Sequence, residues 1–244
     1  MTAEDEARYS TAFFHTQQDG SRRSAQTIIP IVQELVPAAS VLDVGCGTGG
    51  WLAEFQSAGV RDIVGVDGDY VDLNMLQISR EQFIARDLTQ PLALGRRFDL
   101  VVSLEVAEHL PASGADTFIQ SLIRHGDVIL FSAAVPYQGG RHHVNEQWPD
   151  YWAAKFTACG YVPIDAIRRK IWQNDNVQWW YAQNTILYVK REALDKHPLL
   201  ADSGEHSALP LIHPRLYMLL SGDYFGSDGY QDGMIVGRKF TPRI

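Results

Sequence analysis

The stretch VLDVGCGTGGWLAEF, residues 41–55, decides the fold. It begins with apolar and β-branched residues suited to a buried strand and passes through four glycines in six positions. It then continues with Trp51, Leu52 and Phe55 at helical spacing, so it predicts a strand, a glycine turn and a helix in succession. Glycines let a ligand approach the backbone, and the free N–H groups at a helix start favour polar or anionic groups. The turn is therefore predicted to bind a nucleotide-type ligand.

A second acidic position narrows the ligand class. Asp67 follows the apolar run DIVGV, 22 residues after Gly45, where an open α/β sheet presents ligand contacts. A carboxylate there accepts two hydrogen bonds from ribose hydroxyls, with Gly68 beside it, although Asp-Gly also forms ordinary turns. Gly45, Gly47 and Gly50 also satisfy the GxGxxG pattern of nicotinamide enzymes. These residues indicate a nucleoside and leave its identity open.

Composition limits the class of protein. The chain has 244 residues, 45% of them hydrophobic and 20% charged, which suits one sizeable α/β core. Its net charge of −8 disfavours a nucleic-acid partner, because phosphate contacts depend on Lys and Arg. Two cysteines far apart predict neither a disulfide framework nor a zinc site. The acidic start and the lack of an 18-residue apolar run predict a cytoplasmic protein with no membrane partner.

Short apolar runs alternate with helical patterns along the chain. Alternation of this kind predicts a parallel sheet covered by helices on both faces. The predicted strands span 40–44, 62–66, 82–86, 98–104 and 127–132, and the predicted helices span 21–36 (kinked or divided at Pro30), 48–58, 112–124 and 147–159.

The pattern changes after residue 160. Residues 161–172 and 179–191 form two strand-like runs joined by the polar link QNDNVQ, with no helix predicted between them. Two strands joined in this way predict an antiparallel pair at a sheet edge. Residues 192–244 are predicted to form a partly helical C-terminal extension.

Together, LDVGCGTGG, GVDGDY, ARDLTQP, FDLVVSLEVAEHLP and the closing antiparallel pair resemble the class I S-adenosylmethionine-dependent methyltransferases of small-molecule type, over about residues 38–191. The resemblance implies an α/β fold: a doubly wound, mostly parallel seven-stranded sheet with an antiparallel terminal strand pair and helices on both faces. It implies a helical lid at 1–37, a cofactor-binding core at 38–191, and an extension at 192–244 that packs on the core or forms a homodimer interface. The implied cofactor is S-adenosyl-L-methionine, with S-adenosyl-L-homocysteine as product.

The resemblance also implies a role for each motif residue. Asp43, Gly45, Gly47 and Gly49 would line the methionine end of the cofactor, Asp67 and Gly68 the ribose, Asp87 and Leu88 the adenine, Glu105 the space beneath the cofactor, and His109 the methyl-transfer centre. Physically, the carboxylates of Asp43 and Glu105 suit a cationic sulfonium and ammonium ligand and would repel a pyrophosphate. The alternatives are that Asp43 stabilises the loop, Glu105 starts a helix, Asp87 caps a turn and His109 packs.

The segment YQGGRHHVNEQWPDYW, residues 137–152, follows the fifth predicted strand and is predicted to contact the acceptor. His142 or His143 would deprotonate the acceptor, since histidine titrates near neutral pH. A metal site of His142, His143 and Glu146 is an alternative, but none is predicted, because adjacent side chains point apart and no acidic cluster is evident. The predicted acceptor contacts are Tyr137, Asn145 and Trp148 on this loop and Tyr9, Phe13 and Phe14 on the N-terminal lid.

The predicted function is methyl transfer to a small molecule, with a hydroxyl of a sugar, glycan or secondary metabolite favoured over a nitrogen or carbon acceptor. Two other classes stay open. A nicotinamide-dependent oxidoreductase would use the same glycine turn, and a non-catalytic partner protein would bind S-adenosylmethionine without turnover.

Overall fold

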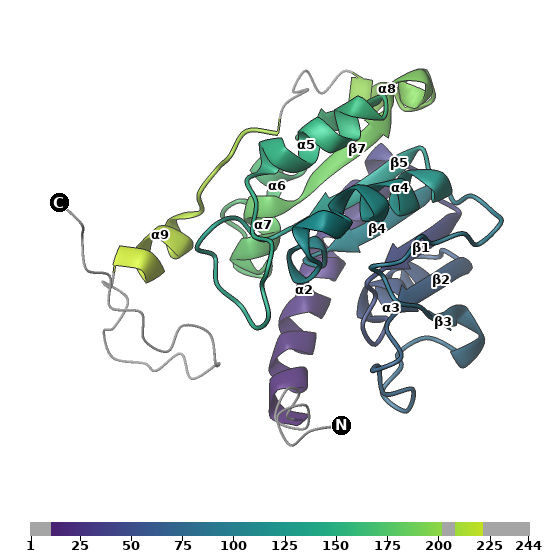
Figure 1. The fold of residues 1–244 in the computed structure, drawn as a ribbon, viewed down its shortest axis with the longest axis horizontal. Helices are drawn as coiled ribbons and strands as arrows, with labels where there is room; N and C mark the ends of the chain where they lie inside the picture. The colour runs from purple at the N-terminus through teal and green to yellow at the C-terminus, as the bar shows by residue number, and fades with distance from the viewer. Residues whose placement is uncertain (1–10, 202–207, 222–244) are drawn as a thin grey trace.

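The computed structural model describes residues 11–201 and 208–221, and within them the strands form one seven-stranded sheet (Figure 1). The strand order is β3-β2-β1-β4-β5-β7-β6. Only β7 runs antiparallel to its neighbours, β5 and β6. The strands are β1 (Ser40–Val44), β2 (Asp62–Asp67), β3 (Phe83–Ala85), β4 (Leu100–Leu104), β5 (Val128–Ser132), β6 (Tyr161–Ile164) and β7 (Ile186–Lys190). The predicted fold class is confirmed.

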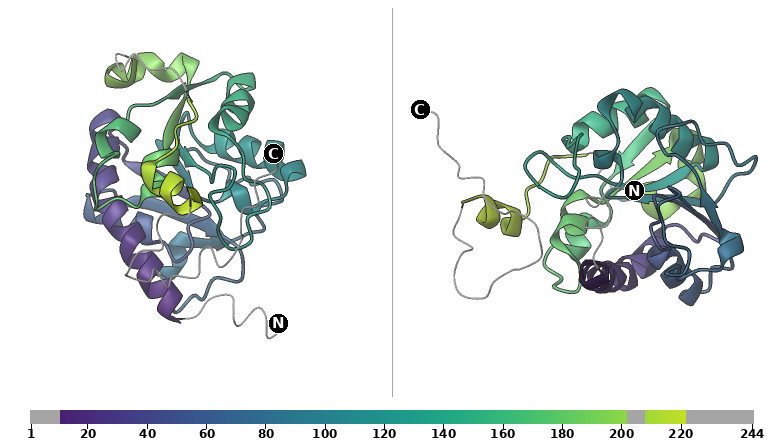
Figure 2. Two further views of the ribbon diagram at one scale, coloured as in Figure 1. Left: turned by 90° about the vertical axis from the view of Figure 1, so that its left-hand side faces the viewer. Right: turned by 60° about the horizontal axis from the view of Figure 1, so that its bottom comes forward.

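Helices cover both faces of the sheet, with α2 on the opposite side from α4 and α5 (Figure 2). Alternate strand residues serve the two faces: Val41 packs with α2 and α3, and Leu42 packs with α4 and α5. The helices are α2 (Thr11–Leu35), α3 (Gly50–Ser57), α4 (Ala115–His125), α5 (Pro149–Ala158), α6 (Arg168–Ile171), α7 (Trp179–Asn184), α8 (Pro198–Ala201) and α9 (Pro214–Ser221), with short 3₁₀ turns at Arg80–Gln82, Ala107–His109, Ala112–Gly114 and Arg191–Lys196.

The sheet changes its winding direction between β1 and β4. Asp43 of β1 pairs with Gly65 of β2 on one side and with Val102 of β4 on the other. In open α/β sheets, ligands bind in the crevice outside the carboxyl ends of the strands at such a switch point. The fold therefore places the ends of β1, β2 and β4 at the expected ligand edge.

Helix α2 is longer and less interrupted than the sequence suggested. It begins at Thr11 rather than residue 21 and passes through Pro30 as one helix. Pro30 lies on the exposed side, whereas Ile29 and Val32 are buried against the sheet. Burial of one complete face stabilises the helix despite the proline.

The predicted hairpin of 161–172 and 179–191 is wrong, although the antiparallel pairing itself is confirmed, with Val162 opposite Val189. Helices α6 and α7 lie between the strands, and β6 ends at Ile164. Ile164, Ile167 and Ile171 are all fully buried on the α2 side of the sheet. Their spacing of three and four residues is helical, and this period was misread as part of a strand.

The C-terminal segment is attached to α6 and α7 by buried polar contacts. The fully buried Arg168 forms an ion pair with Asp165 at 2.6 Å and donates to the carbonyl of Leu209 at 2.8 Å. The backbone amide of His213 donates to the side chain of Gln183 at 2.8 Å. The predicted extension therefore contacts the core along at least part of its length. No helix among the described residues is long and apolar enough to span a bilayer, and both cysteines are free.

Candidate functional site

Acidic side chains lie at the carboxyl ends of three neighbouring strands. Asp43 is in β1, Asp67 ends β2, and Glu105 follows the last residue of β4. Asp43 and Asp67 are each only 4% exposed. Because β1 is paired with both other strands, the three residues converge on one edge of the sheet.

The glycine turn between β1 and α3 has the backbone that its composition predicts. Gly45, Gly47 and Gly49 have φ values of 88°, 53° and 81°, in the region that favours glycine. A Cβ at Gly45 would lie 2.3 Å from Val106, so this glycine permits close packing against the segment after β4. A Cβ at Gly47 would meet no atom within 4 Å, so the space above that residue is open to a ligand.

The Asp67 carboxylate accepts hydrogen bonds from three groups in the loops that follow β1 and β2. The amides of Gly47 and Gly68 donate to its two carboxylate oxygens, each at 2.6 Å. The hydroxyl of Tyr70 donates to the same oxygen as Gly68, at 2.5 Å. A hydroxyl group therefore already occupies a position on this carboxylate like that expected for a ribose. Tyr70 was not predicted as a site residue. Its side chain is 70% exposed, so it belongs to no buried apolar pattern that the sequence could reveal.

Asp43 is held in an unfavourable environment for a carboxylate. Burial, and secondly the charge of Asp67, raise its pKa to about 8. The carboxyl is therefore mostly protonated at neutral pH. A cationic group bound beside Asp43 would reverse this effect, because an opposite charge stabilises the carboxylate.

The predicted adenine contacts lie beside Asp67 but make other interactions. The amide of Arg86 donates to the Asp67 carbonyl at 2.7 Å, which brings the chain at Asp87 to the same edge. The exposed Asp87 carboxylate accepts from the Thr89 hydroxyl at 2.7 Å and the Thr89 amide at 2.9 Å. These two bonds lower its pKa. Leu88 is buried with the α4 and α5 core.

Glu105 is the acceptor of a polar network. Gln138 donates to one of its oxygens at 2.9 Å and Asn184 to the other at 3.1 Å. Burial raises the pKa of Glu105, while the bonds from Ser132, Asn184 and Gln138 partly offset the rise. Glu105 also has a φ of 56°, unusual for a residue other than glycine. Gln138 and Asn184 were not predicted as site residues, because single polar residues beside apolar runs give no motif.

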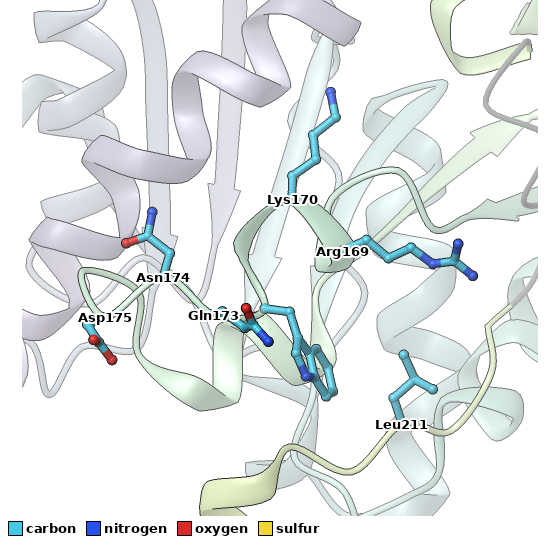
Figure 3. A pocket seen from close by; sticks show the side chains of 7 residues that line it. Arg169, Lys170, Gln173, Asn174, Asp175 and Leu211 are labelled. Carbon is cyan, nitrogen blue, oxygen red and sulfur yellow. The ribbon is translucent and has the colours of Figure 1, made fainter.

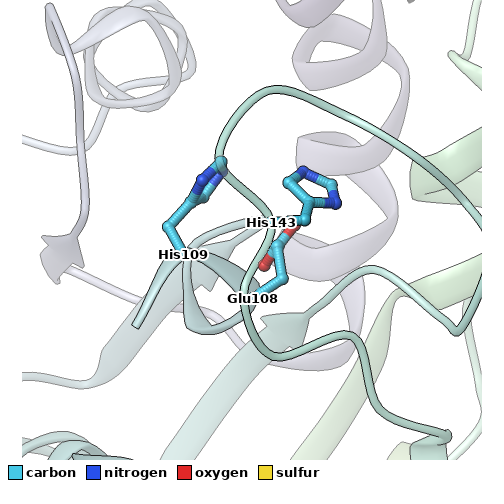
Figure 4. Close-up of side chains that lie close together, drawn as sticks. All are labelled: Glu108, His109 and His143. Atoms are coloured by element: carbon cyan, nitrogen blue, oxygen red, sulfur yellow. The ribbon is translucent and has the colours of Figure 1, made fainter. Parts of the chain in front are cut away.

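A second buried carboxylate, Glu108, lies one turn further along. Figure 4 shows it beside the imidazoles of His109 and His143, and one potential ligand atom from each of the three side chains lies within 4.8 Å of the others. Burial, and secondly the charge of Glu105, raise the pKa of Glu108 well above its usual value. The His109 side chain is exposed on one side, but the protein around the rest of the ring desolvates it, and this effect, followed by the neighbouring His143, lowers its pKa to about 4. Glu108 lies within the motif FDLVVSLEVAEHLP, and no role was predicted for it.

The loop after β5 folds back over this cluster. The amides of Val144 and Asn145 donate to the carbonyl of Glu108 at 2.9 and 3.0 Å. Asn145 is buried, while Tyr137, His142 and Trp148 are exposed. The structure thus brings His143 and Asn145 to the Glu105–His109 segment.

Glu146 fixes the position of His143 within this loop. One of its oxygens lies 3.0 Å from His143 Nδ1. Burial raises the pKa of Glu146, but the hydrogen bonds with His143 and with the amides of Tyr137 and Gly139 outweigh burial and hold the pKa below its usual value. The ionised carboxylate therefore favours a proton on Nδ1 of His143 and a lone pair on Nε2.

The predicted lid contacts cannot be placed in the site. Tyr9 lies outside the described residues. Phe13 and Phe14 belong to α2, but only their backbone is described.

A separate hollow of about 850 Å³ lies beside α6 (Figure 3). Its lining includes no predicted site residue, and it is wide open to solvent. The residues that line it are Arg169, Lys170, Trp172, Gln173, Asn174, Asp175 and Leu211. We place the candidate site at the strand ends instead, because the converging carboxylates and the glycine turn lie there.

The sheet order and the glycine turn with its carboxylates at the strand ends are those of a class I methyltransferase fold. The family model described as a methyltransferase domain matches residues 15–179. The chain belongs to that family, which confirms the predicted class I S-adenosylmethionine-dependent methyltransferase. No curated protein sequence matches the chain.

Solved structures share the fold at low sequence identity. DesVI from Streptomyces venezuelae is 17% identical with a TM-score of 0.56, over 75% of this chain and 98% of its own. The plantazolicin methyltransferase BpumL, solved with a desmethyl substrate analogue and S-adenosylhomocysteine, is 14% identical with a TM-score of 0.55, over 77% and 91%. The sugar N-methyltransferase KedS8 from a Streptoalloteichus species is 18% identical with a TM-score of 0.54, over 69% and 87%. These likenesses concern the fold.

Proposed function

We propose that this protein transfers a methyl group from S-adenosylmethionine to a small-molecule acceptor, and that the acceptor atom is a hydroxyl oxygen. The observation that carries the proposal is the pair of buried aspartates, Asp43 in β1 and Asp67 at the end of β2, beside a glycine turn that has open space at Gly47. Two carboxylates suit the ammonium group and the ribose hydroxyls of this cofactor. They would repel a pyrophosphate, which argues against a nicotinamide dinucleotide.

Each part of the edge has a proposed task. Asp43 and the turn from Gly45 to Gly49 hold the methionine end, Asp67 and Gly68 hold the ribose, and Asp87 and Leu88 border the adenine. To accept the ribose, Asp67 exchanges the Tyr70 hydroxyl for a hydroxyl of the ligand. Glu105, held by Gln138 and Asn184, supplies further negative charge beneath the cationic cofactor.

When bound, S-adenosylmethionine supplies the methyl group, which the acceptor oxygen takes by in-line displacement as the carbon–sulfur bond breaks and S-adenosylhomocysteine forms. The chain's task is to align the two reactants and exclude water. The acceptor proton passes to His142 or His143 on the loop after β5. Tyr137, Asn145 and Trp148 on that loop, with Tyr9, Phe13 and Phe14 of the N-terminal segment, are the proposed acceptor contacts.

Several observations favour a compact polyhydroxylated acceptor such as a sugar, a glycan or a related natural product. The loop after β5 offers amide, carboxylate and imidazole groups beside exposed aromatic rings. The solved structures described above include an enzyme named as a sugar N-methyltransferase and one named as a plantazolicin methyltransferase.

A homodimer is a further proposal, with the exposed Tyr217, Met218 and Leu220 of α9 as its contacts.

Calorimetric titration with S-adenosylmethionine, S-adenosylhomocysteine, NAD and NADP tests the cofactor class. We expect binding of the first two in the micromolar range and none of the dinucleotides. Binding of NAD or NADP alone would overturn the proposal. Incubation with S-adenosylmethionine and a panel of sugars and phenols, followed by mass spectrometry, then tests transfer. Tight cofactor binding without any methylated product or S-adenosylhomocysteine would favour the non-catalytic alternative.

A further inference from the structure

The cluster of Glu108, His109 and His143 has the composition of a metal site. The three side chains come from the 3₁₀ turn Ala107–His109 and from the loop after β5, and potential ligand atoms lie within 4.8 Å of one another (Figure 4). Tetrahedral ligands of a zinc-sized ion lie about 3.4 Å apart, given metal–nitrogen bonds of about 2.0–2.1 Å. Movements of about 1 Å by the side chains would therefore close the set around an ion.

Glu108 gives an independent reason to expect a cation. Its side chain is 0% exposed, and neither carboxylate oxygen has a partner at full hydrogen-bond geometry among the described residues, although the backbone of Glu108 and Ala134 partly offsets the effect of burial on its pKa. A buried carboxyl group with poorly placed partners is destabilising. The carboxyl group of Glu105 lies beside it and can share a proton with it, but it adds a second negative charge when both groups are ionised. A bound cation would satisfy both oxygens and offset both charges.

Both histidines are already oriented as metal ligands usually are. His143 Nδ1 lies 3.0 Å from the Glu146 carboxylate, and the ring of His109 forms a hydrogen bond with the backbone of His142. Metal-bound histidines generally donate their second ring N–H to a carboxylate or a carbonyl in this way. Each ring therefore keeps one nitrogen lone pair for an ion.

We propose that Glu108, His109 and His143 bind one divalent cation of the zinc, cobalt or manganese type. Two imidazole ligands favour these ions over magnesium or calcium, which prefer oxygen ligands. Three protein ligands leave at least one coordination position open, as in catalytic rather than structural sites. No metal was predicted from the sequence, because the candidate ligands His142, His143 and Glu146 share one segment and Glu108 lies on another.

The ion's role rests on the proposed function, but its binding does not. Val106 contacts the cofactor turn at Gly45, and Glu108 lies two residues beyond it, so the ion would lie next to the methyl donor's edge. Its open position would take an acceptor hydroxyl, lower the pKa of that hydroxyl and orient it. With His143 occupied as a ligand, His142 remains as the proton acceptor. The acceptor class then becomes one whose hydroxyl oxygen can bind a metal ion, such as a sugar or a phenol.

Metal binding is measurable without cofactor or acceptor. The full-length protein is stripped with a chelator and titrated with Co²⁺, Zn²⁺, Mn²⁺ and Mg²⁺ by calorimetry, with the visible absorption of Co²⁺ as a second readout. We expect one ion per chain, with Mg²⁺ at least about tenfold weaker than the other three. Absence of stoichiometric Co²⁺ and Zn²⁺ binding in the wild type would overturn the proposal.

Variants assign the ligands. Glu108→Gln keeps the shape of the side chain and should weaken Co²⁺ binding at least about tenfold, and His109→Ala, at an exposed ring, should do the same. Glu192→Gln, at an exposed glutamate outside the cluster, is the matched control and should leave the affinity unchanged. Unchanged Co²⁺ affinity and absorption in both cluster variants would place the ion elsewhere and refute the assignment. Circular dichroism melting confirms that each variant folds, and His109→Ala suffices if Glu108→Gln does not.

The two proposals fail separately. Metal binding without S-adenosylmethionine binding would refute the proposed function and leave the cation site standing. S-adenosylmethionine binding and methyl transfer in metal-stripped protein, with no ion bound on titration, would do the reverse.

Discussion

The cofactor side and the acceptor side of the site both contain residues with positive φ angles, but the residue types differ. On the cofactor side, Gly45 and Gly47 take the positive φ angles, and backbone amides satisfy the Asp67 carboxylate. On the acceptor side, Tyr137 and His142 have positive φ angles although they carry side chains. Such conformations cost about 1–3 kcal/mol each in ordinary residues. The turn on the cofactor side thus takes its unusual backbone angles at glycines. The acceptor side takes them at residues for which they are strained.

This difference predicts different sensitivities. Changes that add atoms to the backbone should damage the cofactor side, because its ligand and its neighbours approach the chain closely. Changes of charge or hydrogen bonding should dominate on the acceptor side, where the buried Glu108 lies next to the half-buried Glu105.

The largest effect is expected from Gly45→Ala. Its φ of 88° is unfavourable for alanine, and the added Cβ would overlap the side chain of Val106. We expect a loss of about 2–4 kcal/mol in the free energy of unfolding, measured by urea denaturation. Gly47→Ala should lose only about 1–2 kcal/mol, because its Cβ meets no protein atom, yet it should weaken cofactor binding. Gly59→Ala, with φ of 99° and open space, controls for conformation alone. Equal losses at positions 45 and 59 would contradict the packing argument.

Asp43→Asn should stabilise the ligand-free protein and weaken cofactor binding. The pKa of Asp43 is raised from 3.8 to about 8 by burial and by Asp67, so the folded state holds a proton that the unfolded chain releases. Wild-type stability should therefore fall as pH rises from about 4 to 8, by up to about 2–3 kcal/mol after allowing for relaxation. Asparagine does not titrate, so the variant should lack this loss. Urea denaturation at pH 5, 6.5 and 8 measures it, with the exposed Asp69→Asn as control. A parallel pH dependence in wild type and Asp43→Asn would contradict the assignment.

Asn184→Ala should lower stability by about 1–2 kcal/mol, because it removes the donor to Glu105 and a bond of 2.9 Å to Gln138. The loss should shrink in Asn184→Ala combined with Glu105→Gln, since the buried charge is then gone. Thermal melting of the four proteins forms the cycle. Strict additivity would show that the network does not couple these two residues.

The smallest effect is expected from Tyr70→Phe. Removing the hydroxyl frees one position on Asp67 and costs one part-buried hydrogen bond, about 1 kcal/mol. We expect S-adenosylmethionine to bind about two- to fivefold more tightly, because it no longer displaces that hydroxyl. Weaker binding in calorimetry would instead assign Tyr70 to the bound state as a cofactor contact.

The same contrast explains what the sequence could reveal. The cofactor side was predictable because the strand, the glycine turn and the helix are contiguous in sequence. Glycine favours positive φ values, and Gly45, Gly47 and Gly49 have them. The sheet was predictable because parallel strands alternate with helices. Only the connection between β6 and β7 was misread, where Ile164, Ile167 and Ile171 fit both a strand-like run and a helical period.

The acceptor side depends on contacts that no local pattern carries. Glu108 and His143 are 35 positions apart in sequence, and they meet because the loop after β5 bonds to the Glu108 carbonyl. Gln138 and Asn184 come from different segments and meet at Glu105. Such clusters follow from tertiary packing, so reading His142, His143 and Glu146 within one segment could not find the partner glutamate.

The most direct test of the account is the dissociation constant of S-adenosylmethionine, measured by calorimetry in wild type, Asp67→Asn and Glu108→Gln. If the glycine turn and the carboxylates beside it hold the cofactor, Asp67→Asn should bind at least about tenfold more weakly, and Glu108→Gln should stay within about threefold of wild type. Equal affinity in wild type and Asp67→Asn, or an equally large loss in Glu108→Gln, would contradict the division of the site into a cofactor side and an acceptor side.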